Sequence, residues 1–188
     1  PVNDPLDFGF AWYRSRGGSS APTLQIIDDT AGIGSLNVLN VFTLSSSTRA
    51  LSAAIEEVTL ANPGDSISMA FDLRLVGSIP SDPSYGFRFG IHDSLGTPVT
   101  QDGGTEVTDD DIGYTGYFDT GASAVSTCSV RGDNDPTSFM GGSVRALGGT
   151  SDDPAYALDD NLSHHIELLV QRRFDGTLGR DVHDVELY

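Results

Sequence analysis

Residues 85–119, YGFRFGIHDSLGTPVTQDGGTEVTDDDIGYTGYFD, contain the pattern that decides the fold. At their start every second residue is apolar (Phe87, Phe89 and Ile91), which is the pattern of a strand with one buried face. A Gly-Thr-Pro turn and a long acidic loop follow, and then a second segment rich in aromatic residues. We therefore predict two strands joined by an acidic loop, which together form one lip of a binding face.

The same two-residue period recurs on both sides of this stretch. Residues 67–75 place an apolar side chain at five alternate positions, which is the cleanest strand pattern in the chain. Residues 164–174 alternate again, and the pair Asp175-Gly176 predicts a hairpin that leads into a return strand over residues 182–188. We expect the apolar sides of these segments to share one interior.

Shorter segments complete the pattern. Residues 7–14, 23–28 and 36–44 are predicted to be strands, and residues 51–60 combine a helix-like composition with β-branched residues that favour a strand. Turn residues separate these segments, and no convincing helical period occurs. The sequence therefore predicts an all-β fold, an antiparallel two-sheet β-sandwich (jelly roll) with few or no helices.

Length and charge limit the function further. The 188 residues suit one domain, predicted as a single β-sandwich over residues 1–188 that lacks its last strand or strands. The net charge of -17 would repel a nucleic-acid backbone, and no apolar run is long enough to span a membrane. Cys128 is the single cysteine, so no internal disulfide forms. All basic residues are arginine, and most acidic residues are aspartate. This composition fits a saline or calcium-rich environment, or merely the base composition of the genome. We expect a secreted or cell-surface protein.

Five segments together resemble a known family: FAWYR, SISMAFDLRL, FRFGIHDSLGT, GYTGYFDTG and HHIELLVQRRFDGTL. They are similar to secreted bacterial proteins that carry a concanavalin A-like lectin/glucanase (laminin-G-like) jelly roll. The resemblance implies two curved sheets, a concave face that holds an extended glycan, and edge loops that hold calcium. Such domains usually continue for a strand or two after a segment like residues 181–188, so a partner donating a strand would complete the fold.

Catalytic signatures of that family are missing. The resemblance implies a Glu-x-Asp-x-x-Glu motif for the glucanases and a Tyr-x-Lys motif for the alginate lyases, and this chain has neither. An arrangement of His92, Arg88 and Tyr117 could still abstract a proton from a uronate, as general-base chemistry permits. A non-catalytic protein is the leading hypothesis, and a polysaccharide lyase is kept as an alternative.

Acidic clusters in the loops are candidates for calcium, which binds carboxylate, amide and carbonyl oxygens. None has the spacing of an EF-hand, and each is also consistent with a solvated acidic loop. The preferred candidate ligands lie in two clusters, Asp109, Asp110 and Asp111, and Asp133, Asn134 and Asp135.

Polar side chains on the outer positions of the long strands are the candidate ligand-binding groups. They would line a groove with donors for sugar hydroxyls, carboxylates or sulfates, and aromatic rings would stack on the sugar. The alternative is that the polar groups are ordinary solvent-facing residues and that Trp12 and Tyr117 belong to the core. The candidates are Asp72, Arg74, Arg88, His92, Gln171 and Arg173, with Tyr114, Tyr117 and Trp12 as the rings.

The leading functional prediction is therefore an extracellular, lectin-like module that binds a polysaccharide or other glycan, with calcium shaping its loops. An alternative is a structural surface or filament subunit, which assembles with copies of itself by strand exchange or calcium-bridged contacts.

Overall fold

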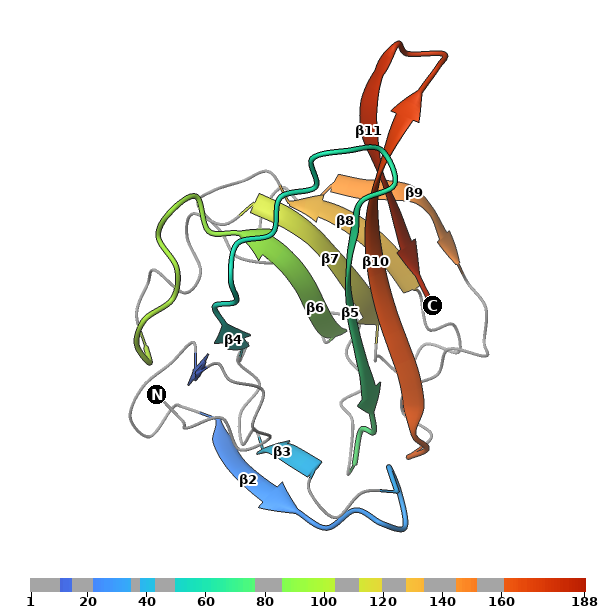
Figure 1. Ribbon diagram of the computed structural model, residues 1–188. Helices are drawn as coiled ribbons and strands as arrows, with labels where there is room; N and C mark the ends of the chain where they lie inside the picture. The colour runs from blue at the N-terminus through green and yellow to red at the C-terminus, as the bar shows by residue number, and fades with distance from the viewer. Residues whose placement is uncertain are drawn as a thin grey trace. The chain divides into compact units, whose positions relative to one another are not determined.

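The computed structural model describes most of the strand-forming chain, and at some strand positions the backbone alone. The described residues are 11–14, 22–34, 38–42, 50–76, 86–103, 112–119, 128–133, 145–151 and 161–188. These residues form eleven β-strands and no helix (Figure 1). Within the same ranges no helix is long and apolar enough to cross a membrane. The prediction of an all-β, antiparallel protein is confirmed.

The chain divides into two compact units, each assembled from three separate segments. The first unit contains Pro1–Glu56, Asp93–Ile112 and Asp135–Gly142. The second contains Glu57–His92, Gly113–Asn134 and Ser143–Tyr188. Most of the long strands lie in the second unit.

The first unit contains two small antiparallel sheets. Strand β1 (Trp12–Arg14) pairs with β4 (Leu51–Ala53), and β2 (Thr23–Ile27) pairs with β3 (Val38–Phe42). Arg14 also forms an ion pair with Asp102, whose Oδ1 accepts the backbone N–H of Arg14 at 2.9 Å. This contact ties β1 to a loop far away in the sequence.

The predicted strand over residues 51–60 is much shorter than expected. Only the three residues of β4 are extended and paired, and residues 54–61 have no regular secondary structure. The reason is that Ile55 and Val58 are both more than half exposed, so these two apolar residues have no interior to face.

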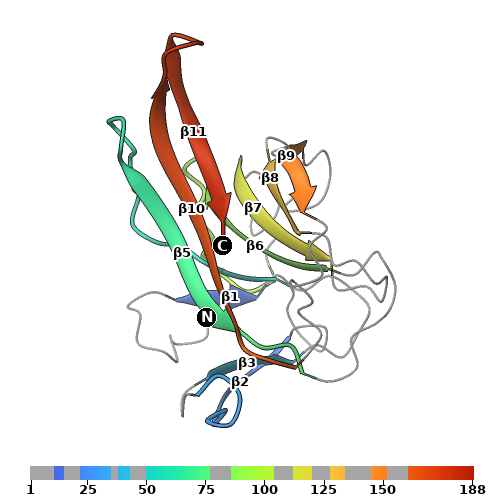
Figure 2. The same cartoon turned by 90° about the vertical axis from the view of Figure 1, so that its right-hand side faces the viewer.

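One sheet of the second unit has the strand order β11-β10-β5, with antiparallel pairing throughout (Figure 2). Its strands are β5 (Ser66–Leu73), β10 (His164–Asp175) and β11 (Arg180–Leu187). Side chains alternate between buried or half-buried and exposed positions along β5, as the two-residue period predicts. The predicted hairpin is present, because β10 and β11 are joined by the turn over residues 176–179.

The other sheet of this unit has the order β6-β7-β8-β9. Its strands are β6 (Gly86–Asp93), β7 (Ile112–Asp119), β8 (Cys128–Asp133) and β9 (Arg145–Ser151). The two strands predicted from residues 85–119 are thus neighbours. Gly116 of β7 lies directly beneath the ring of Phe89 on β6, so its lack of a side chain makes room for that ring.

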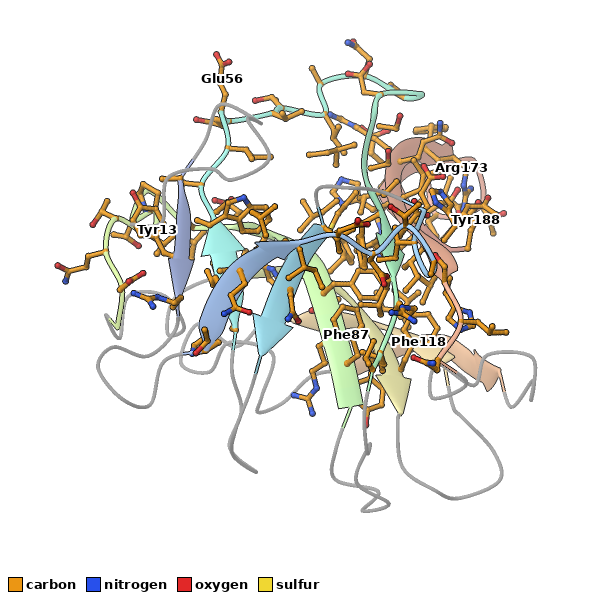
Figure 3. All side chains as sticks on the ribbon, turned by 90° about the horizontal axis from the view of Figure 1, so that it is seen from below. Tyr13, Glu56, Phe87, Phe118, Arg173 and Tyr188 are labelled. Carbon is orange, nitrogen blue, oxygen red and sulfur yellow. The ribbon has the colours of Figure 1, made fainter. Side chains whose placement is uncertain are left out.

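Side chains from both sheets of the second unit meet in one hydrophobic cluster. Its buried members are Phe89, Phe118, Ile166 and Leu168. Half-buried residues of β5, β6 and β11 pack around them, including Phe71, whose ring meets that of Phe89 edge-on at 5.1 Å. Figure 3 labels Phe87 and Phe118, two of the aromatic side chains involved. The prediction that the three periodic segments share one interior is confirmed.

Candidate functional site

The predicted ligand-binding residues of the second unit are divided between its two sheets. Asp72, Gln171 and Arg173 lie on the face of the β11-β10-β5 sheet that points away from the hydrophobic cluster, because their neighbours in sequence point into it. Arg88 and His92 lie on the equivalent face of β6, opposite Phe87 and Phe89. The structure therefore does not bring these residues into one groove.

We use the term outer face for the solvent-exposed side of the β11-β10-β5 sheet. The register of the three strands places its side chains in rows, and small residues on β5 leave the neighbouring side chains accessible. It contains Ser66, Ser68, Ala70 and Asp72 on β5, His165, Glu167, Leu169, Gln171 and Arg173 on β10, and Asp184 and Glu186 on β11, followed by Tyr188.

A histidine–aspartate pair lies at one end of the outer face. His165 Nδ1 lies 2.8 Å from Asp72 Oδ1, and both side chains are more than half exposed. The two residues are direct cross-strand neighbours on β10 and β5. They offer a hydrogen-bonding pair to a ligand that lies along the sheet.

An arginine held by two carboxylates lies towards the other end. Arg173 Nε donates to Asp184 Oδ2 at 2.5 Å and Nη2 donates to Oδ1 at 3.1 Å, which is a bidentate pair. Asp175 approaches the same guanidinium at 3.5 Å. The hydrogen bond from Arg173 lowers the pKa of Asp184, and the same contact raises the pKa of Arg173. This geometry fixes the guanidinium on the surface.

Between these two pairs, Glu167 lies beside Tyr188. Their backbones exchange two hydrogen bonds, of 3.0 Å from Glu167 N–H and 2.9 Å from Tyr188 N–H. The Tyr188 hydroxyl donates to Glu186, which raises the pKa of Tyr188. The Tyr188 side chain is 59% exposed. Figure 3 labels Arg173 and Tyr188, whose side chains belong to this face. An exposed ring thus lies among acceptor and donor groups.

Tyr117 does not provide a free ring surface. It is only 7% exposed, and the guanidinium carbon of Arg88 lies 5.2 Å from the centre of its ring. Beside it, the buried Thr115 hydroxyl lies 3.3 Å from His92 Nε2. Burial and the arginine together explain why Tyr117 is a packing residue, which was the alternative that the sequence left open.

The remaining predicted residues lie in three other places. Tyr114 points to the opposite side of β7 from Tyr117, where its hydroxyl lies 2.8 Å from His183 Nδ1 and burial raises its pKa. Arg74 follows the end of β5 and donates to Asn161 at 3.4 Å. Trp12 is half-buried on β1 in the first unit.

Most of the predicted calcium ligands lie outside the described residues. This applies to Asp109, Asp110, Asp111, Asn134 and Asp135, while Asp133 is the last residue of β8 and is described by its backbone alone. Among the residues that the structure does describe, no group of three acidic, histidine or cysteine side chains could hold a metal ion. Calcium binding stays a prediction.

Several polar or aromatic residues of the outer face, among them His165, Glu167, Asp184 and Tyr188, were not among the candidates from the sequence. His165 and Glu167 share the alternate positions of β10 with Gln171 and Arg173, so the same period already placed them there. Asp184 and Tyr188 follow the same alternation in the return strand. Their position beside β10 depends on the register of the hairpin, which the two-residue period alone does not give.

Comparison with protein-family models, with curated proteins and with solved structures finds no match for this chain.

Proposed function

We propose that this protein is a non-catalytic, lectin-like module of the β-sandwich type that binds a glycan on the outer face. The observation that carries the proposal is the exposed Tyr188 ring, which lies beside Glu167 on a face that also carries Gln171 and the His165–Asp72 pair. A secreted or cell-surface location belongs to the same proposal.

The chemistry of this face suits a sugar. A pyranose ring presents an apolar face, which an exposed tyrosine can cover, and a rim of hydroxyls, which need donors and acceptors. Glu167 supplies acceptors and Gln171 supplies both kinds of group. Ser66, Ser68 and Ala70 are small enough to let an extended chain lie flat across the strands.

Binding is favoured over hydrolysis because three of the carboxylates of this face, other than that of Glu167, are held in fixed pairs. Asp72 contacts His165, Asp184 is held by Arg173, and Glu186 accepts the hydroxyl of Tyr188. A glycosidase needs one carboxylic acid with a raised pKa to protonate the leaving oxygen. The pKa of Asp184 is shifted in the opposite direction, because Arg173 lowers it.

A panel of immobilised glycans, probed with the purified protein with and without a calcium chelator, tests the proposal. Tyr188→Ala should weaken binding to the best glycan about tenfold, which corresponds to about 1.4 kcal/mol, and Gln171→Ala should weaken it less. Val58→Ala, which changes an exposed side chain elsewhere in the second unit, is the matched control and should bind as the parent does.

Loss of binding with chelator would support the calcium part of the proposal. If no glycan binds the folded protein, or if Tyr188→Ala and Gln171→Ala bind as well as Val58→Ala, the outer face is not a sugar site.

A further inference from the structure

Strand β11 is the end strand of its sheet. The order is β11-β10-β5, and in the part of the chain that the structure describes β11 pairs with β10 alone. The backbone of Tyr188 exchanges hydrogen bonds with Glu167. In an antiparallel strand the backbone N–H and C=O groups of successive residues point alternately to one neighbouring strand and to the other side. Since Tyr188 points towards β10, the backbone groups of Asp181, His183 and Val185 point to the opposite edge of β11. Such an edge is a template for another strand.

Side chains along this edge include two exposed apolar groups and an arginine. Leu178 is 57% exposed and Tyr188 is 59% exposed. Arg180 is exposed, and its side chain makes no hydrogen bond or ion pair with any other described residue. Glu186 is also exposed, six residues further along the strand. The strand thus carries a cation near one end and an anion near the other.

We propose that β11 pairs antiparallel with β11 of a second copy of this chain, about a two-fold axis at His183. In this register Arg180 lies opposite Glu186 of the second copy, and the ion pair occurs twice by symmetry. Tyr188 of the second copy then lies beyond the paired residues, beside the turn that contains Leu178. Direct cross-strand pairs of opposite charge or of apolar groups stabilise a sheet.

The neighbouring registers are less complementary. An axis at Asp184 would place two Asp184 carboxylates opposite each other and leave Arg180 opposite Tyr188. An axis at Val182 would place Arg180 opposite Asp184, which Arg173 already holds in a bidentate ion pair, whereas Glu186 is held only by the neutral hydroxyl of Tyr188. A shift of a single residue would put exposed side chains of one copy on the buried side of the other. Of these registers only the axis at His183 places Arg180 opposite Glu186, and it also places Val182 opposite Asp184.

This pairing joins two three-stranded sheets into one continuous sheet by strand addition. The inference does not depend on glycan binding, because it rests on the backbone edge and on the Arg180–Glu186 pair; it shares Glu186 and Tyr188 with the outer face. It specifies how copies of this chain would assemble, namely by antiparallel pairing of β11 with β11.

Sedimentation at several concentrations of the whole chain tests the assembly. The parent protein should form a dimer. Arg180→Glu and Glu186→Arg should each raise the dimer dissociation constant about tenfold or more, since each places like charges opposite one another twice. The double variant with both changes should recover most of the affinity. Glu57→Arg, a charge reversal at an exposed residue outside the strand, is the control and should leave the dimer unchanged.

Cysteine cross-linking in a Cys128→Ser background tests the register. Arg180→Cys combined with Glu186→Cys should give a covalent dimer on mild oxidation, because opposed residues in a non-hydrogen-bonded pair are within disulfide reach. Within one chain these positions are about 20 Å apart and cannot bridge. Val182→Cys with Glu186→Cys should not cross-link, because these residues are opposed only with the axis at Asp184. A monomer at about 100 μM, or cross-linking of the second pair instead of the first, would overturn the proposal.

Discussion

Replacement of Gly116 by alanine tests the hydrophobic cluster of the second unit at its tightest point. A Cβ atom at this position would lie 2.4 Å from Cζ of Phe89 and 2.8 and 2.9 Å from its two Cε atoms. The Phe89 ring cannot easily retreat, because Phe71 meets it edge-on at 5.1 Å and Phe87 and Phe118 stack against it at 5.7 and 5.9 Å. The added methyl group must therefore displace packed aromatic rings.

Overpacking of this kind typically costs about 1–3 kcal/mol. For a chain of this size, each kcal/mol shifts the melting temperature by about 2–4 °C. Gly116→Ala should therefore lower the melting temperature of the second unit by roughly 2–12 °C, measured by calorimetry and by thermal circular dichroism. Phe89→Leu in the same chain should recover part of this loss, because the smaller side chain leaves room for the methyl group.

Gly176→Ala in the β10–β11 turn is the matched control. A Cβ atom there would meet nothing within 4 Å, so the free energy of unfolding should change by no more than about 0.5 kcal/mol. If Gly116→Ala melts at the same temperature as Gly176→Ala, Phe89 does not pack on Gly116 and the described interior is incorrect.

Two further changes test other parts of the fold. Leu168→Ala should lower the free energy of unfolding by about 2–5 kcal/mol in urea titrations, because Leu168 is 0% exposed, while Leu162→Ala at an exposed position should stay within about 0.5 kcal/mol. The hydrogen bond from Arg14 lowers the pKa of Asp102 in the folded state. The stability from this pair is therefore present above the unfolded pKa of about 3.9 and is lost as pH falls through the folded value. Asp102→Asn should remove that part of the acid dependence, and an unchanged acid profile would contradict it.

Strands β5, β6 and β10 of the second unit were predictable because each has one apolar face. In β10, Ile166, Leu168 and Val170 alternate with exposed or half-buried residues, and the structure buries all three. The turn before β5 was predictable for a local reason: Pro63 fixes its own φ, and Gly64 adopts a φ of +99°, which a glycine tolerates. Local chemistry and a two-residue period suffice for such elements.

The arrangement of the polar residues was not predictable in the same way. A strand pattern tells which residues share a face, but it does not tell which sheet a strand joins. Arg88 and Arg173 both occupy polar positions on long strands, yet they lie on different sheets. The prediction of a strand after β4 was wrong for another reason. The composition of this segment suits a strand, but no other described strand covers its exposed apolar residues, Ile55 and Val58.

The β10–β11 hairpin links the two proposals, because its two sides carry different interactions. Its inner side buries Leu168 and Val170, and its outer side carries Glu167, Gln171 and the aromatic ring of Tyr188. The backbone edge of β11 is a third surface, which shares Glu186 and Tyr188 with the outer side. Gln171 lies on β10, away from that edge, so Gln171→Ala should affect glycan binding without changing the dimer. If Gln171→Ala altered dimerisation as strongly as Arg180→Glu, the outer face and the strand edge would not be separate surfaces.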